Sequence, residues 1–153
     1  MTLLSASARA ALVAVATIGL DQGVKALVRA DISPGERIGV VPGLHLVRTS
    51  NSGVAFGLFA SGGVLLIAIG VLALAALLAF FVTHARQRLA WLPTGLLIGG
   101  AAGNLIDRLR QGAVTDFIQL PHWPAFNVAD MAITVGVVAL VLVIETASRR
   151  ASR

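Results

Sequence analysis

Residues 64–82 read VLLIAIGVLALAALLAFFV, nineteen residues without a charged side chain. As an α-helix that rises about 1.5 Å per residue, the stretch would cover roughly 28 Å, close to the hydrocarbon thickness of a bilayer. A charge-free run of that length is typical of a helix that crosses a membrane. We therefore predict a transmembrane helix over residues 61–84.

The composition of the chain also indicates a membrane protein. Of the 153 residues, 57% are hydrophobic and only 12% are charged, and the mean hydropathy is +0.88. Soluble domains usually have about a quarter of their residues charged. The absence of cysteine excludes disulfides, thiolate metal sites and a cysteine nucleophile. The length suits one bundle of a few helices, so we expect a single integral membrane domain over residues 1–153.

Three further segments are apolar but shorter: residues 10–20, 91–103 and 131–144. Each reaches a spanning length only if its helix includes neighbouring polar residues. We therefore expect helices over residues 8–28, 91–109 and 127–148, which makes a membrane all-α fold of four transmembrane helices. The first helix resembles a signal peptide, but its apolar run continues beyond Ala14-Val15-Ala16, so we expect it to be retained.

Two regions without helical pattern, residues 36–60 and 113–119, predict a small extracytoplasmic β-sheet. Residues 37–41 and 44–48 flank a Pro42-Gly43 turn, which is typical of a hairpin. Residues 113–118 form a further extended segment that carries Asp116. A sheet of this kind could serve as a cradle for a bound chain.

An even number of spans places both termini on one side of the membrane. Lys and Arg divide equally between the two sides, six on each, so their count alone does not give the orientation. The acids, however, gather on the side opposite the termini, which leaves the tails and the link near residue 86 with an excess of arginines over acids. We therefore place both termini in the cytoplasm, and we assign the net charge of +5 to membrane topology rather than to nucleic acid.

Alternating helices bring the unusual polar residues to one end of the bundle. Ionisable groups at membrane depth are costly and normally face the bundle interior, each with a partner. Topology alone thus predicts one polar site near the outer surface. The residues that meet there are Asp21, Lys25, Asn51, Asn104, Asp107, Asn127 and Asp130.

Each polar motif also has a structural interpretation. Asn127 followed by Asp130 has the spacing of a helix capping box. Asp21 and Lys25, four residues apart on one helical face, can form an ion pair that neutralises charge in the membrane. The presence of Asp116 beside Asp130 favours a pair of carboxylates over a cap alone.

Asp107 and Arg108 can hold the turn after the third helix. Glycines that repeat every four residues at 95, 99 and 103 favour close helix packing within a monomer over dimerisation. Lys25 is the only lysine, and no serine has the context of a nucleophile, which argues against a serine–lysine dyad. The histidines are scattered without ligand spacing, so we expect no metal and no cofactor; they are His45, His84 and His122.

Five stretches resemble the prolipoprotein signal peptidase family, also called signal peptidase II, in the family's order. They are Asp21-Gln-Gly-Val-Lys25, Asn51-Ser-Gly-Val-Ala-Phe-Gly57, Gly99-Gly-Ala-Ala-Gly-Asn-Leu-Ile-Asp-Arg108, Val114-Thr-Asp-Phe117 and Phe126-Asn-Val-Ala-Asp130. The first stretch alone would be a weak signal, whereas the combination is highly specific.

The resemblance implies an aspartyl protease of the bacterial cell inner membrane, with Asp116 and Asp130 as the catalytic pair. Its substrate would be a prolipoprotein that carries diacylglycerol on a cysteine, and the cut just before that cysteine would release the signal peptide. The other positions that match the family's substrate-binding or site-shaping residues are Asp21, Lys25, Asn51, Gly53, Gly100, Asn104, Asp107, Arg108, Asn127 and Ala129.

Two neighbouring carboxylates share one proton, because both cannot easily ionise together. The positive end of the fourth helix favours the ionised form of Asp130, so we expect Asp116 to hold the proton more often. Two other classes compete with this reading: a small ion or proton carrier, since intramembrane acids also mark proton paths, and a structural subunit or membrane chaperone. The inner halves of the helices are nearly free of charge, which argues against a carrier. A structural subunit would not need the paired aspartates.

Overall fold

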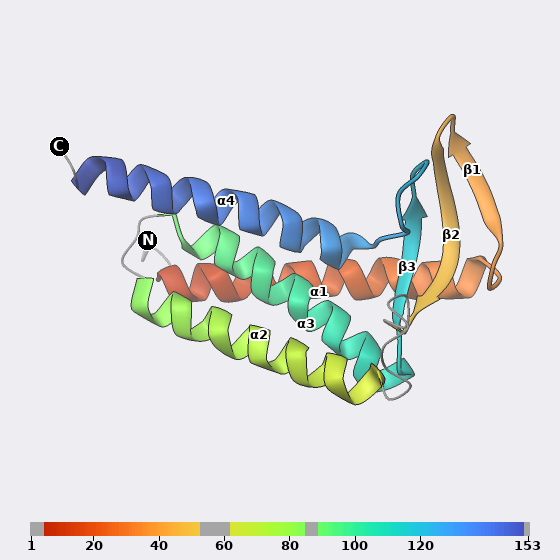
Figure 1. The fold of residues 1–153 in the computed structure, drawn as a ribbon, viewed down its shortest axis with the longest axis horizontal. Coiled ribbons are helices and arrows are strands. Elements are labelled where there is room, and N and C mark those ends of the chain that lie inside the picture. The colour runs from red at the N-terminus through yellow and green to blue at the C-terminus, as the bar shows by residue number, and fades with distance from the viewer. Residues whose placement is uncertain (1–4, 53–61, 85–88, 152–153) are drawn as a thin grey trace.

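The computed structural model describes residues 5–52, 62–84 and 89–151. Four long helices lie side by side, and a small sheet crosses one end of the bundle, opposite the end where both chain termini lie (Figure 1). The helices are α1 (Ala6–Asp31), α2 (Gly62–His84), α3 (Trp91–Gln111) and α4 (Val128–Ala151). The strands are β1 (Arg37–Val41), β2 (Leu44–Asn51) and β3 (Val114–Gln119).

Helix ends differ from the sequence expectations by a few residues, for local reasons. The α1 helix begins at Ala6 rather than residue 8 because the Ser5 hydroxyl accepts a hydrogen bond from the Ala8 amide. It continues to Asp31 rather than residue 28. The α3 helix runs to Gln111 rather than 109 and ends where Gly112 takes a left-handed conformation, with φ of 74°. Residue 61, the expected start of the second helix, lies outside the described residues.

The sheet is antiparallel, in the order β1-β2-β3. The hairpin expected around Pro42-Gly43 is present, and Gly43 at the turn has a φ of 86°. The β2 strand continues beyond residue 48 because its end pairs with β3, where Thr49 lies opposite Asp116. Residues 53–60 of the expected outer region lie outside the described residues.

The α3 helix packs against the other three helices, and its glycines allow the close approach. A Cβ on Gly95 would lie 2.7 Å from the Ala10 carbonyl oxygen, and one on Gly99 would lie 2.8 Å from the Ala14 carbonyl oxygen. A Cβ on Gly100 would lie 2.5 Å from the Ala129 carbonyl oxygen of α4. The glycine stripe therefore serves contacts within the chain, as the sequence predicts.

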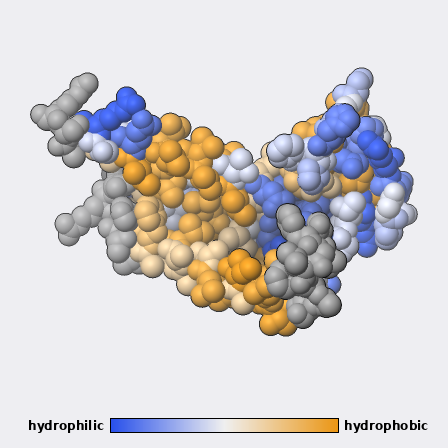
Figure 2. Space-filling model, viewed as in Figure 1, coloured by the Kyte–Doolittle hydropathy of each residue, from blue (hydrophilic) through white to orange (hydrophobic). Residues whose placement is uncertain are grey.

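The outer surface of the helices is apolar, whereas the sheet end is hydrophilic (Figure 2). By length and composition, α1 and the Val128–Arg149 part of α4 can cross a membrane among the described residues, and Val64–Phe80 of α2 is a shorter apolar helix. Charged and polar side chains are instead found inside the bundle, where Asp21, Lys25 and Asp107 are fully buried. This arrangement, apolar outside and polar within, is the one expected for a protein surrounded by lipid.

Candidate active site

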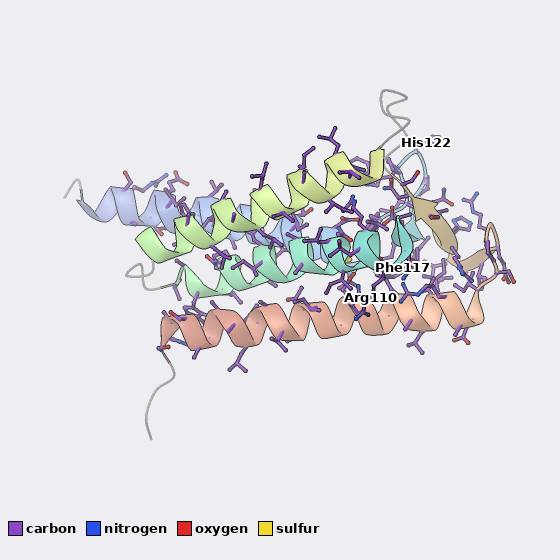
Figure 3. All side chains as sticks on the ribbon, turned by 90° about the horizontal axis from the view of Figure 1, so that it is seen from below. Arg110, Phe117 and His122 are labelled. Atoms are coloured by element: carbon purple, nitrogen blue, oxygen red, sulfur yellow. The ribbon has the colours of Figure 1, made fainter. Side chains whose placement is uncertain are left out.

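Two aspartates meet at the sheet end of the bundle, one from a strand and one from a helix. Asp116 lies in the middle of β3, and Asp130 lies in the first turn of α4. Successive residues of a strand point to opposite faces. Phe117, which is labelled in Figure 3, packs with Val28 of α1 and with Ile32 directly after that helix. That anchor leaves the neighbouring Asp116 side chain directed toward the start of α4, where it contacts Asn127.

Asp116 is only 3% exposed and is held from two sides. The Asn51 side-chain amide at the end of β2 donates to its Oδ2 over 3.0 Å. The Asn127 side-chain amide donates to its Oδ1 over 2.6 Å. The Thr49 hydroxyl donates to the Asp116 backbone carbonyl over 3.1 Å, which fixes the strand at that residue.

Asp130 is fixed by a reciprocal bond pattern at the helix start. Its Oδ2 accepts from the Asn127 backbone amide over 3.2 Å, and its own backbone amide donates to the Asn127 Oδ1 over 2.9 Å. This is the capping box that the spacing indicates. In addition, the Asn104 side-chain amide donates to the Asp130 Oδ1 over 2.8 Å. The cap and the carboxylate pair are therefore one structure, in which Asn127 contacts both aspartates.

Burial raises the pKa of Asp116 above its ordinary value, because the charged form loses solvation. The hydrogen bonds from Asn51 and Asn127 act in the opposite direction, since they stabilise the carboxylate. The negative charge of Asp130 adds to the increase, and the positive charge of Lys25 reduces it. The net effect favours the protonated form of Asp116.

A buried ion cluster lies directly beneath the pair. The expected ion pair is present, with Lys25 Nζ 2.8 Å from Asp21 Oδ2. Lys25 Nζ also lies 3.0 Å from Asp107 Oδ2 and donates over 3.0 Å to Asn104 Oδ1. Because Lys25 binds the Asn104 oxygen, the Asn104 nitrogen points toward Asp130. The cluster thus orients a residue that contacts the carboxylate pair.

The same cluster joins the elements that carry the two aspartates. Asp107 Oδ2 accepts from the Thr115 backbone amide over 3.0 Å, which fastens β3 to α3 next to Asp116. Asp21 Oδ1 accepts from the Ala129 backbone amide over 3.0 Å, which fastens α4 next to Asp130. Asp107 therefore holds the turn after α3 as expected, through a strand amide.

Arg108 faces a different way from Asp107, because adjacent helical residues do not share a face. Its Nη1 is 3.4 Å from the Asn104 carbonyl oxygen, and its buried Nε has no hydrogen-bond partner among the described residues. Gly100 lies at the close contact between α3 and α4 described above. Gly53 lies outside the described residues.

Three residues that were not among the expected site residues also join the cluster: Gln22, Arg29 and Thr115. Gln22 donates to Asp107 Oδ1 over 3.0 Å and to the Gly103 carbonyl over 3.1 Å. Arg29 donates to the Thr115 hydroxyl over 3.2 Å. Gln22 lies inside the Asp21–Lys25 stretch and Thr115 inside the Val114–Phe117 stretch, so the position of each was an available signal. Nothing local marks Arg29.

Two hollows open beside the aspartates, near the notch between bundle and sheet seen in Figure 2. One, of about 310 Å³, is lined mainly by polar residues and includes Asp116. The other, of about 340 Å³, is apolar except at Asp130 and Thr134. The first is lined by Thr49, Ser50, Asn51, Ser52, Asp116, Gln119, Pro124 and Ala125; the second by Leu120, Trp123, Phe126, Asp130, Met131, Thr134 and Val135.

Within the described parts of the chain, no group of three or more histidines and acids is placed to hold a metal ion. The arrangement instead offers two carboxylates, each of which accepts hydrogen bonds from asparagine. Asp116 lines the polar hollow and Asp130 lines the apolar one. One carboxylate that favours its proton and a partner at a helix start can act together as general acid and general base on water and a bound amide.

Comparison with known proteins gives a consistent result. Residues 13–146 match the family model described as Signal peptidase (SPase) II. The lipoprotein signal peptidase of Halothermothrix orenii is 39% identical over 132 residues, which cover 86% of this chain and 91% of that protein. The lipoprotein signal peptidase of Moorella thermoacetica is 41% identical over 131 residues, which cover 84% and 87%.

Two solved structures, both described as bacterial membrane enzymes studied by the in meso method, share the fold. One has a TM-score of 0.83 and 31% identity, and covers 88% of this chain and 91% of its own. The other has a TM-score of 0.82 and 30% identity, and covers 91% and 88%.

Proposed function

Because the chain belongs to the signal peptidase II family, we propose that Asp116 and Asp130 are the catalytic pair with which it cleaves its substrate. Membership makes the chain a membrane-embedded peptidase that removes signal peptides from prolipoproteins. The alternative of an ion or proton carrier has no support in these comparisons. The proposal concerns the catalytic residues, the form of the substrate and the placement in the membrane.

The observation that carries the proposal is the double contact of Asn127. Its side chain donates to Asp116 and accepts from the Asp130 backbone amide, so one residue sets both carboxylates. Burial favours the proton on Asp116, so Asp116 can serve as the general acid of the pair. Asp130 is then the residue left to act as the general base.

In the proposed reaction, ionised Asp130 takes a proton from water while the water oxygen attacks the scissile carbonyl carbon. Asp116 donates its proton to the carbonyl oxygen, which gives a tetrahedral diol. When the diol collapses, the carbon–nitrogen bond breaks and the leaving nitrogen takes the proton from Asp130. Asp116 recovers a proton from a diol hydroxyl, so both residues return to their starting states.

We propose that the substrate is a prolipoprotein already modified with diacylglycerol, cleaved just before the modified cysteine. The polar hollow at Asp116 suits an extended peptide, whose backbone needs hydrogen-bond partners. The apolar hollow at Asp130 suits acyl chains, since its wall is formed by Leu120, Trp123 and Phe126 among others. One hollow includes Asp116 and the other includes Asp130, so a peptide with a lipid-modified cysteine at the cut can contact both.

We further propose that all four helices cross the inner membrane, in a monomer with both termini in the cytoplasm and the site near the outer face. The termini lie at the end opposite the sheet (Figure 1), and the arginines of the tail carry no matching excess of acids. The α3 helix can cross despite its charge, because Asp107 is fully buried and paired with Lys25.

The test is cleavage of a lipid-modified prolipoprotein by purified Asp116→Asn and Asp130→Asn variants. Loss of a general acid or base lowers the rate about 10²–10⁴-fold, so we expect the kcat of each variant to fall by at least about 10²-fold. Asp31→Asn, an exposed acid at the same end of the molecule, is the control and should retain activity. Normal cleavage by both site variants would remove the aspartic mechanism.

A further inference from the structure

A third hollow, of about 150 Å³, lies at the sheet end of the bundle, and neither catalytic aspartate contributes to it. It is formed where the end of α1 meets β2, β3 and the last residue of α3. Two arginines lie on its wall together with neutral polar side chains. The lining residues are Arg29, Pro34, Arg48, Thr49, Ser50, Gln111 and Thr115.

Both arginines are anchored through one nitrogen of the guanidinium group. Arg48 Nη1 donates to the Arg29 carbonyl over 2.9 Å and to the Ile32 carbonyl over 3.2 Å. Arg29 Nη1 donates to the Thr115 hydroxyl over 3.2 Å. A guanidinium has five N–H donors, so further donors remain on each group. Anchored in this way, the two side chains lose little conformational entropy when they bind an anion.

The acids of this region cancel at most one of the two charges. Asp21 and Asp107 both pair with Lys25, and the second carboxylate charge faces Arg29, whose Nη1 is 3.8 Å from Asp107 Oδ1. Among the described residues no carboxylate forms a salt bridge with Arg48. Glu36 accepts from the Ser33 backbone amide over 2.7 Å, and Asp31 is exposed on α1; neither lines the hollow. Arg110 adds a positive charge at the same end of the bundle (Figure 3).

The size and position of the hollow restrict the ligand. Its volume of about 150 Å³ is that of about five water molecules, which suits one phosphate group and excludes an acyl chain. It lies at the hydrophilic end of the molecule, beyond the apolar surface of the helices (Figure 2). At that level a membrane protein meets lipid headgroups. We propose that this hollow binds the phosphate group of an anionic membrane lipid.

The phosphate hollow also adjoins the polar hollow of the proposed peptidase site, although neither catalytic aspartate lines it. Thr49 and Ser50 line both this hollow and the polar hollow at Asp116. A bound phosphate would connect the end of α1 with the strand β2, which ends at Asn51. The lipid would thereby brace the strand whose last residue contacts Asp116.

The experiment measures lipid retained on the purified full-length chain by native mass spectrometry, with phosphatidylglycerol or phosphatidylcholine added at equal concentration. We expect the chain to retain one phosphatidylglycerol molecule, and to retain much less phosphatidylcholine. The key variant is Gln111→Glu, which places a negative charge in the hollow and leaves both arginines in position. It should weaken phosphatidylglycerol binding about tenfold or more, equivalent to about 1.4 kcal/mol.

Val40→Glu is the matched control, because it makes the same change in net charge on exposed strand β1. It should bind like the original chain, as should Asp116→Asn, which separates this proposal from the peptidase mechanism. Equal retention of both lipids, or equal losses in Gln111→Glu and Val40→Glu, would overturn the proposed site. Inorganic phosphate at constant ionic strength should compete only weakly; binding as tight as that of the lipid would assign the hollow to a free anion instead.

Discussion

At the scale of single residues, Asn127 has two separable duties. Its backbone and side chain form the cap of α4 with Asp130, and its side-chain nitrogen donates to Asp116 and to the Asn104 Oδ1. Serine is as good as asparagine at a helix cap, but it has no amide nitrogen to reach Asp116. A serine at this position therefore keeps the cap and removes the bond to the catalytic carboxylate.

We predict that Asn127→Ser lowers kcat about 10–100-fold. Asp116 becomes ionised when it gives its proton to the carbonyl oxygen, and a lost hydrogen bond to a charged group corresponds to about 1.5–3 kcal/mol. The thermal unfolding temperature should change little. Asn127→Ala should lose about the same activity and should also lose roughly 1 kcal/mol of stability, because the cap is gone. If Asn127→Ser were fully active, the contact with Asp116 would have no catalytic importance.

The raised pKa of Asp116 predicts how stability depends on pH. Its folded-state pKa lies above the ordinary value of 3.8, so the folded chain binds this proton more tightly than the unfolded chain does. The stabilisation from this group is complete below pH 3.8 and is lost as pH rises through the folded-state pKa. The unfolding temperature of the original chain should therefore fall with rising pH in that window, relative to Asp116→Asn.

The measurement is a series of thermal unfolding curves in detergent for both proteins. The difference between their unfolding temperatures, original minus variant, should decrease as pH rises and then level off. A difference that increases with pH would mean that the hydrogen bonds from Asn51 and Asn127 outweigh burial, and that Asp116 prefers to be ionised.

At the scale of secondary-structure elements, the glycines of the bundle divide into two kinds. A Cβ on Gly99 would lie 2.6 Å from the Thr17 Cβ and 2.8 Å from the Ala14 carbonyl oxygen, whereas one on Gly19 would meet nothing within 4 Å. The first distances are too short for any side chain. Gly99 therefore sets the separation of α1 and α3, and Gly19 does not.

We predict that Gly99→Ala destabilises the fold by about 1–3 kcal/mol, the usual cost of overpacking. Gly19→Ala is the matched control and should be neutral or stabilising by up to about 1 kcal/mol, because alanine favours the helix. Thermal unfolding in one detergent compares the two variants directly. Equal behaviour of both would show that α1 can move away from α3 at no cost.

Local signals predict the elements well and their ends less well. The helix predicted from the charge-free run at residues 64–82 and the hairpin predicted from the Pro42-Gly43 turn each depend on neighbouring residues alone. The structure has both, as α2 and as the β1–β2 pair. The end of α3 had an unused local signal in Gly112. The extension of β2 to Asn51 had none, because the partner strand comes much later in the chain: the Asn51–Asp116 bond joins residues 65 positions apart.

The same distinction applies to the site. The motif residues could be expected to converge because alternating helices bring their ends together. The contacts of Arg29 with Thr115 and of Gln22 with Asp107 join positions 86 and 85 residues apart. They depend on how α1 is rotated against α3 and β3. A periodic pattern of apolar residues does not define that rotation when lipid and interior are equally apolar.

At the scale of the whole molecule, the arrangement in Figure 1 leads to a prediction of topology. The chain has no cysteine, so single-cysteine variants report on one position each. In intact cells with a permeable outer layer, Val40→Cys on the sheet should react with a membrane-impermeant maleimide. Ser148→Cys near the C-terminal end should react only after lysis. The reverse pattern would place the sheet in the cytoplasm and would contradict the proposed orientation.

The loop between β3 and α4 has a consequence for how the protein tolerates different bilayers. Phe126 bonds back to the strand, its amide to the Ile118 carbonyl over 2.9 Å and its carbonyl to the Phe117 amide over 3.0 Å. Strand, loop and helix start thus form one closed loop that holds both aspartates on the same short piece of chain. Helices that tilt to match a thinner or thicker bilayer would carry this piece along as a unit. The acyl-chain length of the host lipid should therefore change the rate at which substrate enters the site. The distance between the two carboxylates should stay constant.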